Sequence, residues 1–195
     1  MNYMSLARAA IDHVDSLKMR SNNRSFRLDG VCDRAGRALG VAANMQFGAI
    51  LGELIDEHPA LADDPLASAL VAPVLAGRKL RFGNCEARAG EAFLYLAKQG
   101  VHPLECMAVV NGDSDHVFVV LGRDQATAIP NGQWNADAVI CDPWARSCYK
   151  ASLLREQLAL PIFQGIIAPP PYEFVQTCER PDGSWPPKAL RHVPL

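Results

Sequence analysis

The chain has 195 residues, of which 49% are hydrophobic and 21% are charged. This composition is typical of a folded globular protein and argues against a disordered one. The formal net charge of −2 creates no strong field toward nucleic acid or an anionic membrane, and no stretch reaches the roughly 18 apolar residues of a membrane span. We therefore expect no nucleic-acid partner and no membrane span.

The N-terminal residues 1–18 carry charges throughout and lack the apolar core of a secretory signal, which predicts synthesis in a cytoplasm. The chain has six cysteines, but a domain of this length needs no disulfide staples, and the sequence holds no CxxC pair or His-rich tract. We expect no metal site and no cofactor, and we expect most of the thiols to be buried as small apolar groups. The oligomeric state is not indicated.

Apolar residues recur at helical spacing in three stretches of the first 78 residues. The predicted helices cover about residues 6–17, 33–57 and 65–75. His58-Pro59 ends the second helix, because a residue before proline avoids the helical region.

The middle of the chain predicts a helix over about residues 86–99, followed by strands over 105–110, 116–121 and 138–141. Asn111-Gly112 is a strong hairpin signal between the first two strands, and residues 124–137 are polar enough for a loop. The predicted fold class is α+β. We expect a single domain over residues 1–195, organised as a helical N-terminal part (1–78), a core with the candidate site (79–150) and an irregular C-terminal extension (151–195).

Cys85 opens the predicted central helix. Backbone N–H groups at a helix start are unpaired, and the helix dipole there favours a negative charge such as a thiolate. Gly83 permits a tight turn before the cysteine, and Asn84 or the free N–H groups are candidates for an oxyanion hole. Glu86 is a candidate supporting residue, although its carboxylate opposes thiolate formation unless it points away.

His116 begins an apolar strand, which would hold an imidazole base rigidly. Asp142 ends a later strand and could accept a hydrogen bond from that imidazole, while Trp144 could shield the bond from water. The sequence thus offers a nucleophile, a base and an orienting carboxylate in chain order. Asp124 and Asp137 are weaker substitutes for Asp142.

Three segments of the chain resemble the motifs of the papain-like superfamily, and most of all its transglutaminase-like branch and bacterial effector and toxin domains built on that core. The segments are Gly83-Asn84-Cys85-Glu86-x-x-Ala89, Asp115-His116-Val117-Phe118-Val119 and Cys141-Asp142-Pro143-Trp144. The resemblance covers about residues 80–150. It implies a fold in which a helix carries the cysteine and packs on an antiparallel sheet that carries the histidine and the aspartate.

The resemblance also implies a cysteine hydrolase or acyltransferase acting on amide carbonyls of protein or peptide substrates, as a glutamine deamidase, a thiol protease or a transglutaminase, without a cofactor. It is compatible with a bacterial effector delivered into another cell, and a housekeeping enzyme stays open. Two other readings stay open as well. One is an inactive binding module on the same core, and the other is transfer of an acyl group to a small molecule by the same triad.

Overall fold

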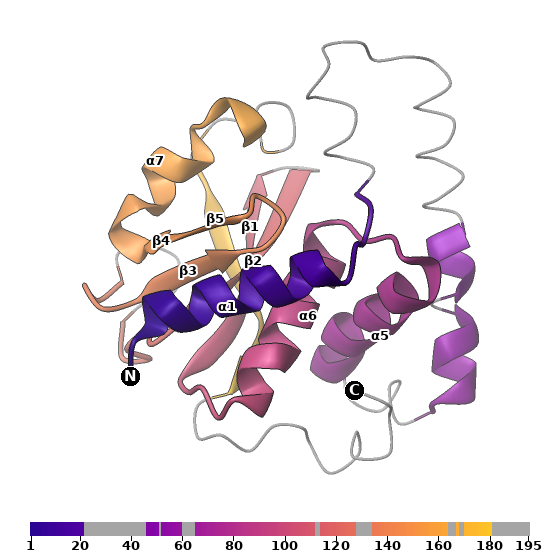
Figure 1. Ribbon diagram of the computed structural model, residues 1–195. Helices are drawn as coiled ribbons and strands as arrows, with labels where there is room; N and C mark the ends of the chain where they lie inside the picture. Colours follow the sequence, from indigo (N-terminus) through magenta and orange to yellow (C-terminus); the bar gives the residue numbers. More distant parts are fainter. Residues whose placement is uncertain are drawn as a thin grey trace.

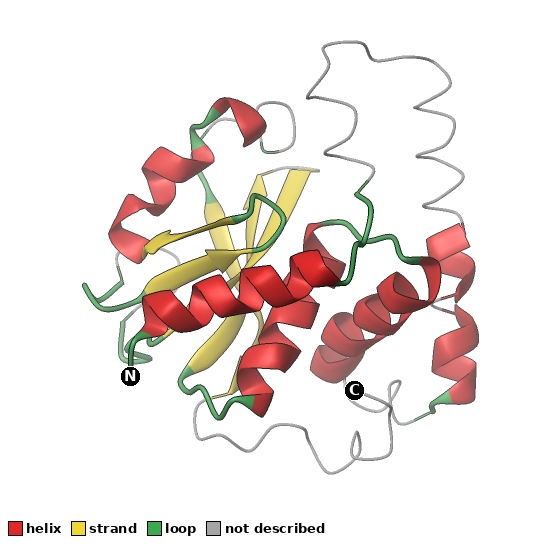
Figure 2. Cartoon of the chain, in the orientation of Figure 1, coloured by secondary structure: helices red, strands yellow, loops and turns green. Residues whose placement is uncertain are grey.

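A computed structural model of the chain describes residues 1–21, 46–50, 52–59, 65–111, 114–127, 134–163, 167 and 170–180. It shows helices packed on one curved sheet (Figures 1 and 2). The elements in chain order are α1 (Tyr3–Ser16), α5 (Pro65–Leu80), α6 (Cys85–Lys98), β1 (Leu104–Asn111), β2 (Ser114–Leu121), β3 (Val139–Asp142), β4 (Ser147–Lys150), η1 (Ala151–Leu153), α7 (Leu154–Leu158), η2 (Pro161–Phe163) and β5 (Glu173–Arg180). Residues 46–50 and 52–57 are also helical.

The five strands form one sheet in the order β4-β3-β2-β1-β5, and every neighbouring pair is antiparallel. β1 and β2 pair along their whole length, from Leu104 opposite Leu121 to Asn111 opposite Ser114. The predicted α+β class is therefore confirmed, as is the antiparallel pairing of the two strands that flank Asn111-Gly112.

Helix α6 lies at the centre of the molecule, where it packs against α1, α5, β1 and β2. Most of its residues are buried, because neighbours cover it on several sides rather than along a single stripe. Close approach of α5 depends on Gly90. A Cβ atom there would lie 2.7 Å from Cγ2 of Val74 and 3.0 Å from the carbonyl oxygen of Leu70, so any larger residue would push α5 away from α6.

One buried carboxylate ties the three helices together. Glu91 on α6 is 2% exposed, and Arg78 on α5 donates two hydrogen bonds to it at 2.8 and 2.9 Å. His13 on α1 lies 3.0 Å from the same carboxylate and stacks on the ring of Tyr95. Burial alone would raise the pKa of Glu91, but the bonds and charges of Arg78 and His13 lower it below its ordinary value.

A second buried ion pair lies near the start of β1. Glu105 on β1 is fully buried, and Arg123 donates to its two carboxylate oxygens at 2.6 Å each. Arg123 also donates to the carbonyl oxygen of Thr127 at 2.6 Å, and Gln176 on β5 donates to Glu105 at 2.7 Å. These bonds satisfy the buried charges and anchor the loop after β2 to the sheet.

Replacing Arg123 with alanine should lower the free energy of unfolding by about 3–5 kcal/mol, because Glu105 would stay buried without its cationic partner. Urea unfolding of both proteins measures the difference. Arg146→Ala is the matched control: Arg146 pairs with Asp15 on the surface, where such pairs contribute about 1 kcal/mol or less. A loss below about 1 kcal/mol for Arg123→Ala would contradict the assignment.

The prediction that residues 151–195 are irregular is wrong for Glu173–Arg180, which form strand β5 beside β1. Of the side chains described along it, only Phe174 is deeply buried, and the register shifts opposite Cys106 and Met107. The alternating pattern is therefore weak, and the strand forms because β1 supplies its hydrogen-bonding partner. Two short helices, η1 and α7, also lie in this segment.

Most of the other predicted elements agree with the structure. The helix expected over 65–75 runs on to Leu80 and passes through Pro73. Residues 33–45 of the second predicted helix lie outside the described residues, as do 128–133 of the predicted loop. Within the part of the chain that is described, no helix is long and apolar enough to cross a membrane.

Candidate active site

Cys85 is the first residue of α6 and is 6% exposed. The turn before it is held by the segment that follows α1, because the backbone N–H of Gly83 donates to the carbonyl oxygen of Arg20 at 2.8 Å. Asn84 is the N-cap residue, and its side-chain oxygen accepts the N–H of Ala87 at 3.3 Å. The thiol is therefore placed on a fixed helix start, as a positioned nucleophile requires.

Gly83 lets this turn fold onto the first turn of the helix. A Cβ atom at residue 83 would lie 2.9 Å from Cβ of Ala87, which real side chains do not tolerate. The structure thus gives Gly83 a packing role, and its contribution to substrate approach stays a prediction.

The backbone at the helix start also offers hydrogen-bond donors. The first N–H groups of a helix have no intrahelical acceptor, and Asn84 takes only that of Ala87. Within the described residues, the N–H groups of Cys85 and Glu86 have no acceptor. These two N–H groups are therefore the candidate oxyanion donors, while the oxygen of Asn84 is engaged in capping.

His116 and Asp142 form a direct, fully buried pair. Nε2 of His116 lies 2.7 Å from Oδ2 of Asp142, and both side chains are 0% exposed. The register of β2 and β3 pairs Val119 with Cys141, so Asp142 lies one step further on, on the same face of the sheet as His116. The other oxygen, Oδ1, accepts the N–H of Ala145 at 2.9 Å, which fixes the carboxylate.

Nδ1 of His116, on the other side of the ring, is buried and has no hydrogen bond of good geometry among the described residues. The Cys85 thiol is nevertheless close enough to act on the imidazole. Burial alone would lower the pKa of His116, but the charge and hydrogen bond of Asp142, followed by the contribution of Cys85, raise it to about 10. The ring therefore carries both protons at neutral pH. The three side chains predicted to act together are brought together.

No family model, curated protein or solved structure matches this chain.

Aromatic rings close the histidine off from water. The ring of Trp144 meets His116 edge-on with a centroid distance of 5.4 Å, and Phe163 does so at 5.0 Å. Trp144 is 1% exposed, and its Nε1 donates to Oγ of Ser21 at 3.2 Å. Trp144 therefore packs against His116, as expected for a residue that shields the imidazole from water. Phe163 and Ser21 were not predicted, because no local pattern links them to His116.

Glu86 follows the cysteine and lies near the acidic residue that precedes the histidine. Burial, and then the charge of Asp115, raise the pKa of Glu86 above its ordinary value. This shift favours the neutral acid, which reduces the opposition of Glu86 to a negative charge on Cys85.

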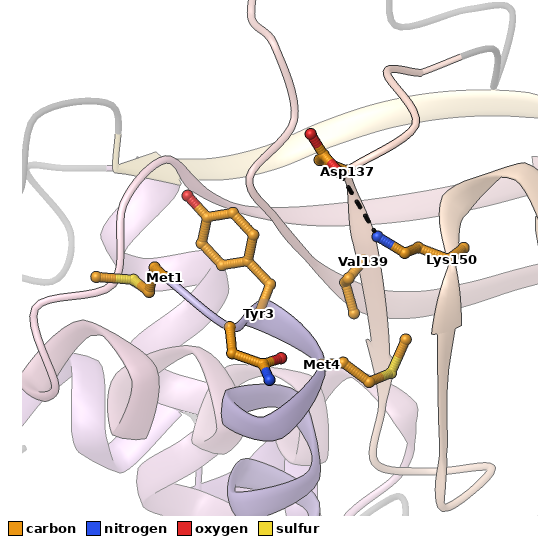
Figure 3. Close-up of a pocket in the computed structure, with 7 residues that line it drawn as sticks. Met1, Tyr3, Met4, Asp137, Val139 and Lys150 are labelled. Carbon is orange, nitrogen blue, oxygen red and sulfur yellow. Dashed lines mark ion pairs between the residues drawn. The ribbon is translucent and has the colours of Figure 1, made fainter.

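The substitutes for Asp142 lie elsewhere. Asp124 is exposed and bonds to the backbone of its own turn. The side chain of Asp137 is 90% exposed and pairs with Lys150 at 3.8 Å. That pair lines a pocket of about 520 Å³ at the start of α1, together with Tyr3 (Figure 3). The pocket is lined by none of Cys85, His116 and Asp142, and of the three candidate carboxylates only Asp142 bonds to His116 among the described residues.

The other described cysteines have different surroundings. Cys106 and Cys141 lie within strands and are 1% and 0% exposed, which confirms their predicted burial. Cys32 and the side chain of Cys178 fall outside the described part.

Among the residues that are described, no group of three His, Cys, Asp or Glu side chains could hold a metal ion.

The raised pKa of His116 predicts a pH titration that can be measured directly. We expect its ring resonances in NMR spectra to stay constant from about pH 6 to 9 and to titrate near pH 10, against about 6.5 for an ordinary histidine. The same shift stabilises the fold. The contribution is complete below about pH 6.5 and is lost as the pH rises through 10. A midpoint for His116 near pH 6.5 would contradict the assignment.

Proposed function

We propose that this protein is a cysteine-dependent acyl-transfer enzyme that acts on amide carbonyls of protein or peptide substrates. The observation that carries the proposal is the buried 2.7 Å contact between His116 and Asp142, with Cys85 at a helix N-terminus and close enough to interact with the imidazole. A thiol, an imidazole and an orienting carboxylate in this order are the parts of an activated nucleophile.

The charge on His116 defines its part in the reaction. Its ring is protonated at neutral pH, so its positive charge can stabilise a thiolate on Cys85, which is the form of the sulfur that attacks a carbonyl. The thiolate attacks the amide carbonyl, the N–H groups of Cys85 and Glu86 stabilise the oxyanion, and His116 donates a proton to the departing amine or ammonia.

The neutral His116 left by this step can then act as a base. It takes a proton from water, which hydrolyses the thioester, or from an amine, which accepts the acyl group. The first outcome is deamidation or proteolysis, and the second is transamidation. Asp142 holds the ring in one orientation through both half-reactions, because both of its oxygens are engaged.

The order of elements supports a papain-like or transglutaminase-like core. The cysteine opens a central helix, the histidine lies in the strand β2, and the aspartate ends the adjacent antiparallel strand β3. This is the arrangement that the motif resemblance implies.

The narrow access to the thiol favours a slender substrate group. Cys85 is 6% exposed, and the other two members of the triad are fully buried. The carboxamide of a glutamine side chain reaches such a thiol with less rearrangement than a main-chain peptide bond does. Glutamine deamidation or transamidation is therefore favoured over endoproteolysis.

One assay separates the three activities. N,N-dimethylcasein supplies accessible glutamines but no free lysine amines. Release of ammonia reports deamidation, incorporation of monodansylcadaverine reports transamidation, and new amino termini report proteolysis. We expect one of the first two signals with the wild-type protein and none with Cys85→Ala. Absence of all three, or signals that Cys85→Ala retains, would reject the proposal.

A further inference from the structure

Away from the imidazole, two further thiols face each other across neighbouring strands. Cys141 on β3 is the direct partner of Cys148 on β4. The same register, continued one step beyond the strands, places Ala138 opposite Ala151. The N–H of Ala151 donates to the carbonyl oxygen of Ala138 at 2.9 Å. In an antiparallel pair, hydrogen-bonded and non-hydrogen-bonded partners alternate. Ala138 and Ala151 are a hydrogen-bonded pair, and Cys141 and Cys148 lie an odd number of steps along the same register. The two cysteines are therefore a non-hydrogen-bonded pair.

Such a pair has the spacing of a disulfide. Non-hydrogen-bonded partners have Cα atoms about 4.5 Å apart, within the range of roughly 4.4–6.8 Å found for disulfides. The sulfurs also lie on the same side of the sheet, toward α1. Sγ of Cys141 is 3.4 Å from the carbonyl oxygen of Ala7, and Sγ of Cys148 is 4.0 Å from Nη2 of Arg8. Both thiols are free in the structure.

We propose that Cys141 and Cys148 are an oxidation-sensitive dithiol that forms a reversible cross-strand disulfide with a low-molecular-weight disulfide, such as glutathione disulfide, as the oxidant. The proposal depends on strand register and side-chain position alone, so it stands whether or not Cys85 is a nucleophile.

The exposure of the two sulfurs gives the order of steps. Cys148 is half-buried and Cys141 is fully buried, so the thiolate of Cys148 attacks the oxidant first, forms a mixed disulfide and releases one glutathione thiolate. The thiolate of Cys141 then attacks Sγ of Cys148 and releases the second glutathione. Burial, followed by the charge of Asp142, raises the pKa of the Cys141 thiol, so this second step is the slow one.

The bond would close the hairpin that carries part of the candidate active site. Asp142 directly follows Cys141, and the turn between β3 and β4 contains Trp144, which packs on His116. Oxidation would therefore lock the turn against the imidazole. The disulfide would close the loop from Cys141 to Cys148 and so restrict the unfolded chain. This restriction should raise the melting temperature by about 5 °C.

Trypsin offers a direct test, because Arg146 lies between the two cysteines. The folded protein is incubated with glutathione disulfide, the remaining thiols are blocked, and the protein is digested without reduction. We expect the loss of two hydrogen atoms by intact mass and a linked pair of peptides, 124–146 with 147–150. The signal should disappear on reduction and be absent in Cys148→Ser.

The control addresses a second pair of cysteines, since Cys106 lies opposite Cys178 in the backbone register of β1 and β5. A mass loss that persists in Cys148→Ser, with no link between 124–146 and 147–150 in the wild type, would overturn the proposal. So would a Cys148 that carries glutathione without passing it to Cys141. Peptide mapping of the wild type decides the matter even if the variant folds poorly.

Discussion

Replacing Cys85 with alanine should remove all turnover on N,N-dimethylcasein, a loss of at least about 10⁴-fold, because members of a nucleophilic triad act as a unit. The fold should survive. Alanine suits the first turn of a helix, the Asn84 cap does not involve the sulfur, and deletion of one partly shielded sulfur should cost about 1 kcal/mol. Ammonia release and dansylcadaverine incorporation measure the activity, and circular dichroism with urea unfolding measures the fold.

Cys106→Ala is the matched control for this experiment. Cys106 is as deeply buried as Cys85 but lies in the middle of β1. Its replacement should cost as much stability as the change at Cys85, or more, while turnover stays within a few-fold of the wild type. Turnover retained by Cys85→Ala, or lost equally in both variants, would show that Cys85 is a packing residue.

Asp142→Asn should reduce turnover by about 10³–10⁴-fold. The asparagine side chain keeps the size of the aspartate and can still accept the N–H of Ala145. It cannot balance the charge of a fully buried imidazolium at Nε2. Burial then dominates, and the pKa of His116 should fall from about 10 to below its ordinary value. At neutral pH the ring would be uncharged and would no longer stabilise the Cys85 thiolate.

Two measurements separate this role from a structural one. The NMR titration of His116 should move to lower pH in Asp142→Asn, and the pH profile of turnover should move with it. Asp137→Asn, at the exposed acid that pairs with Lys150, should change neither. If Asp142→Asn lowers turnover while the His116 titration stays near pH 10, Asp142 does not act through the imidazole.

The sequence predicted the parts of the site that local signals determine. The capped start of α6 follows from Gly83-Asn84 and an alanine-rich helix, and β1 and β2 follow from apolar runs on either side of Asn111-Gly112. Because these elements begin within a few residues of their predicted bounds, Cys85 and His116 were placed correctly on them. Asp142 was preferred to Asp137 from the sequence because it ends a strand, but its contact with His116 depends on the register of β2 and β3, which residue spacing alone does not fix.

The parts that the sequence did not predict depend on contacts between distant segments. Phe163 covers His116 although it follows a short helix in a stretch that lacks clear periodicity. Glu105 looks like an ordinary polar residue in a strand, and its burial depends on an arginine contributed by the loop after β2. Strand β5 needs β1 as its partner. In each case the partner, rather than the local pattern, determines the structure.

The carboxylate of Glu91 has a consequence for dissecting the protein. A fragment limited to residues 79–150 would hold Cys85, His116 and Asp142 but would lose Arg78 and His13, which are the hydrogen-bond partners of the Glu91 carboxylate, a group only 2% exposed on α6. The helix that carries Cys85 could then not pack without an uncompensated charge. The shortest fragment that can be expressed as a folded, assayable unit should therefore include α1 and α5, and deletion libraries that trim from the N-terminal side should lose soluble protein before they lose any residue of the site.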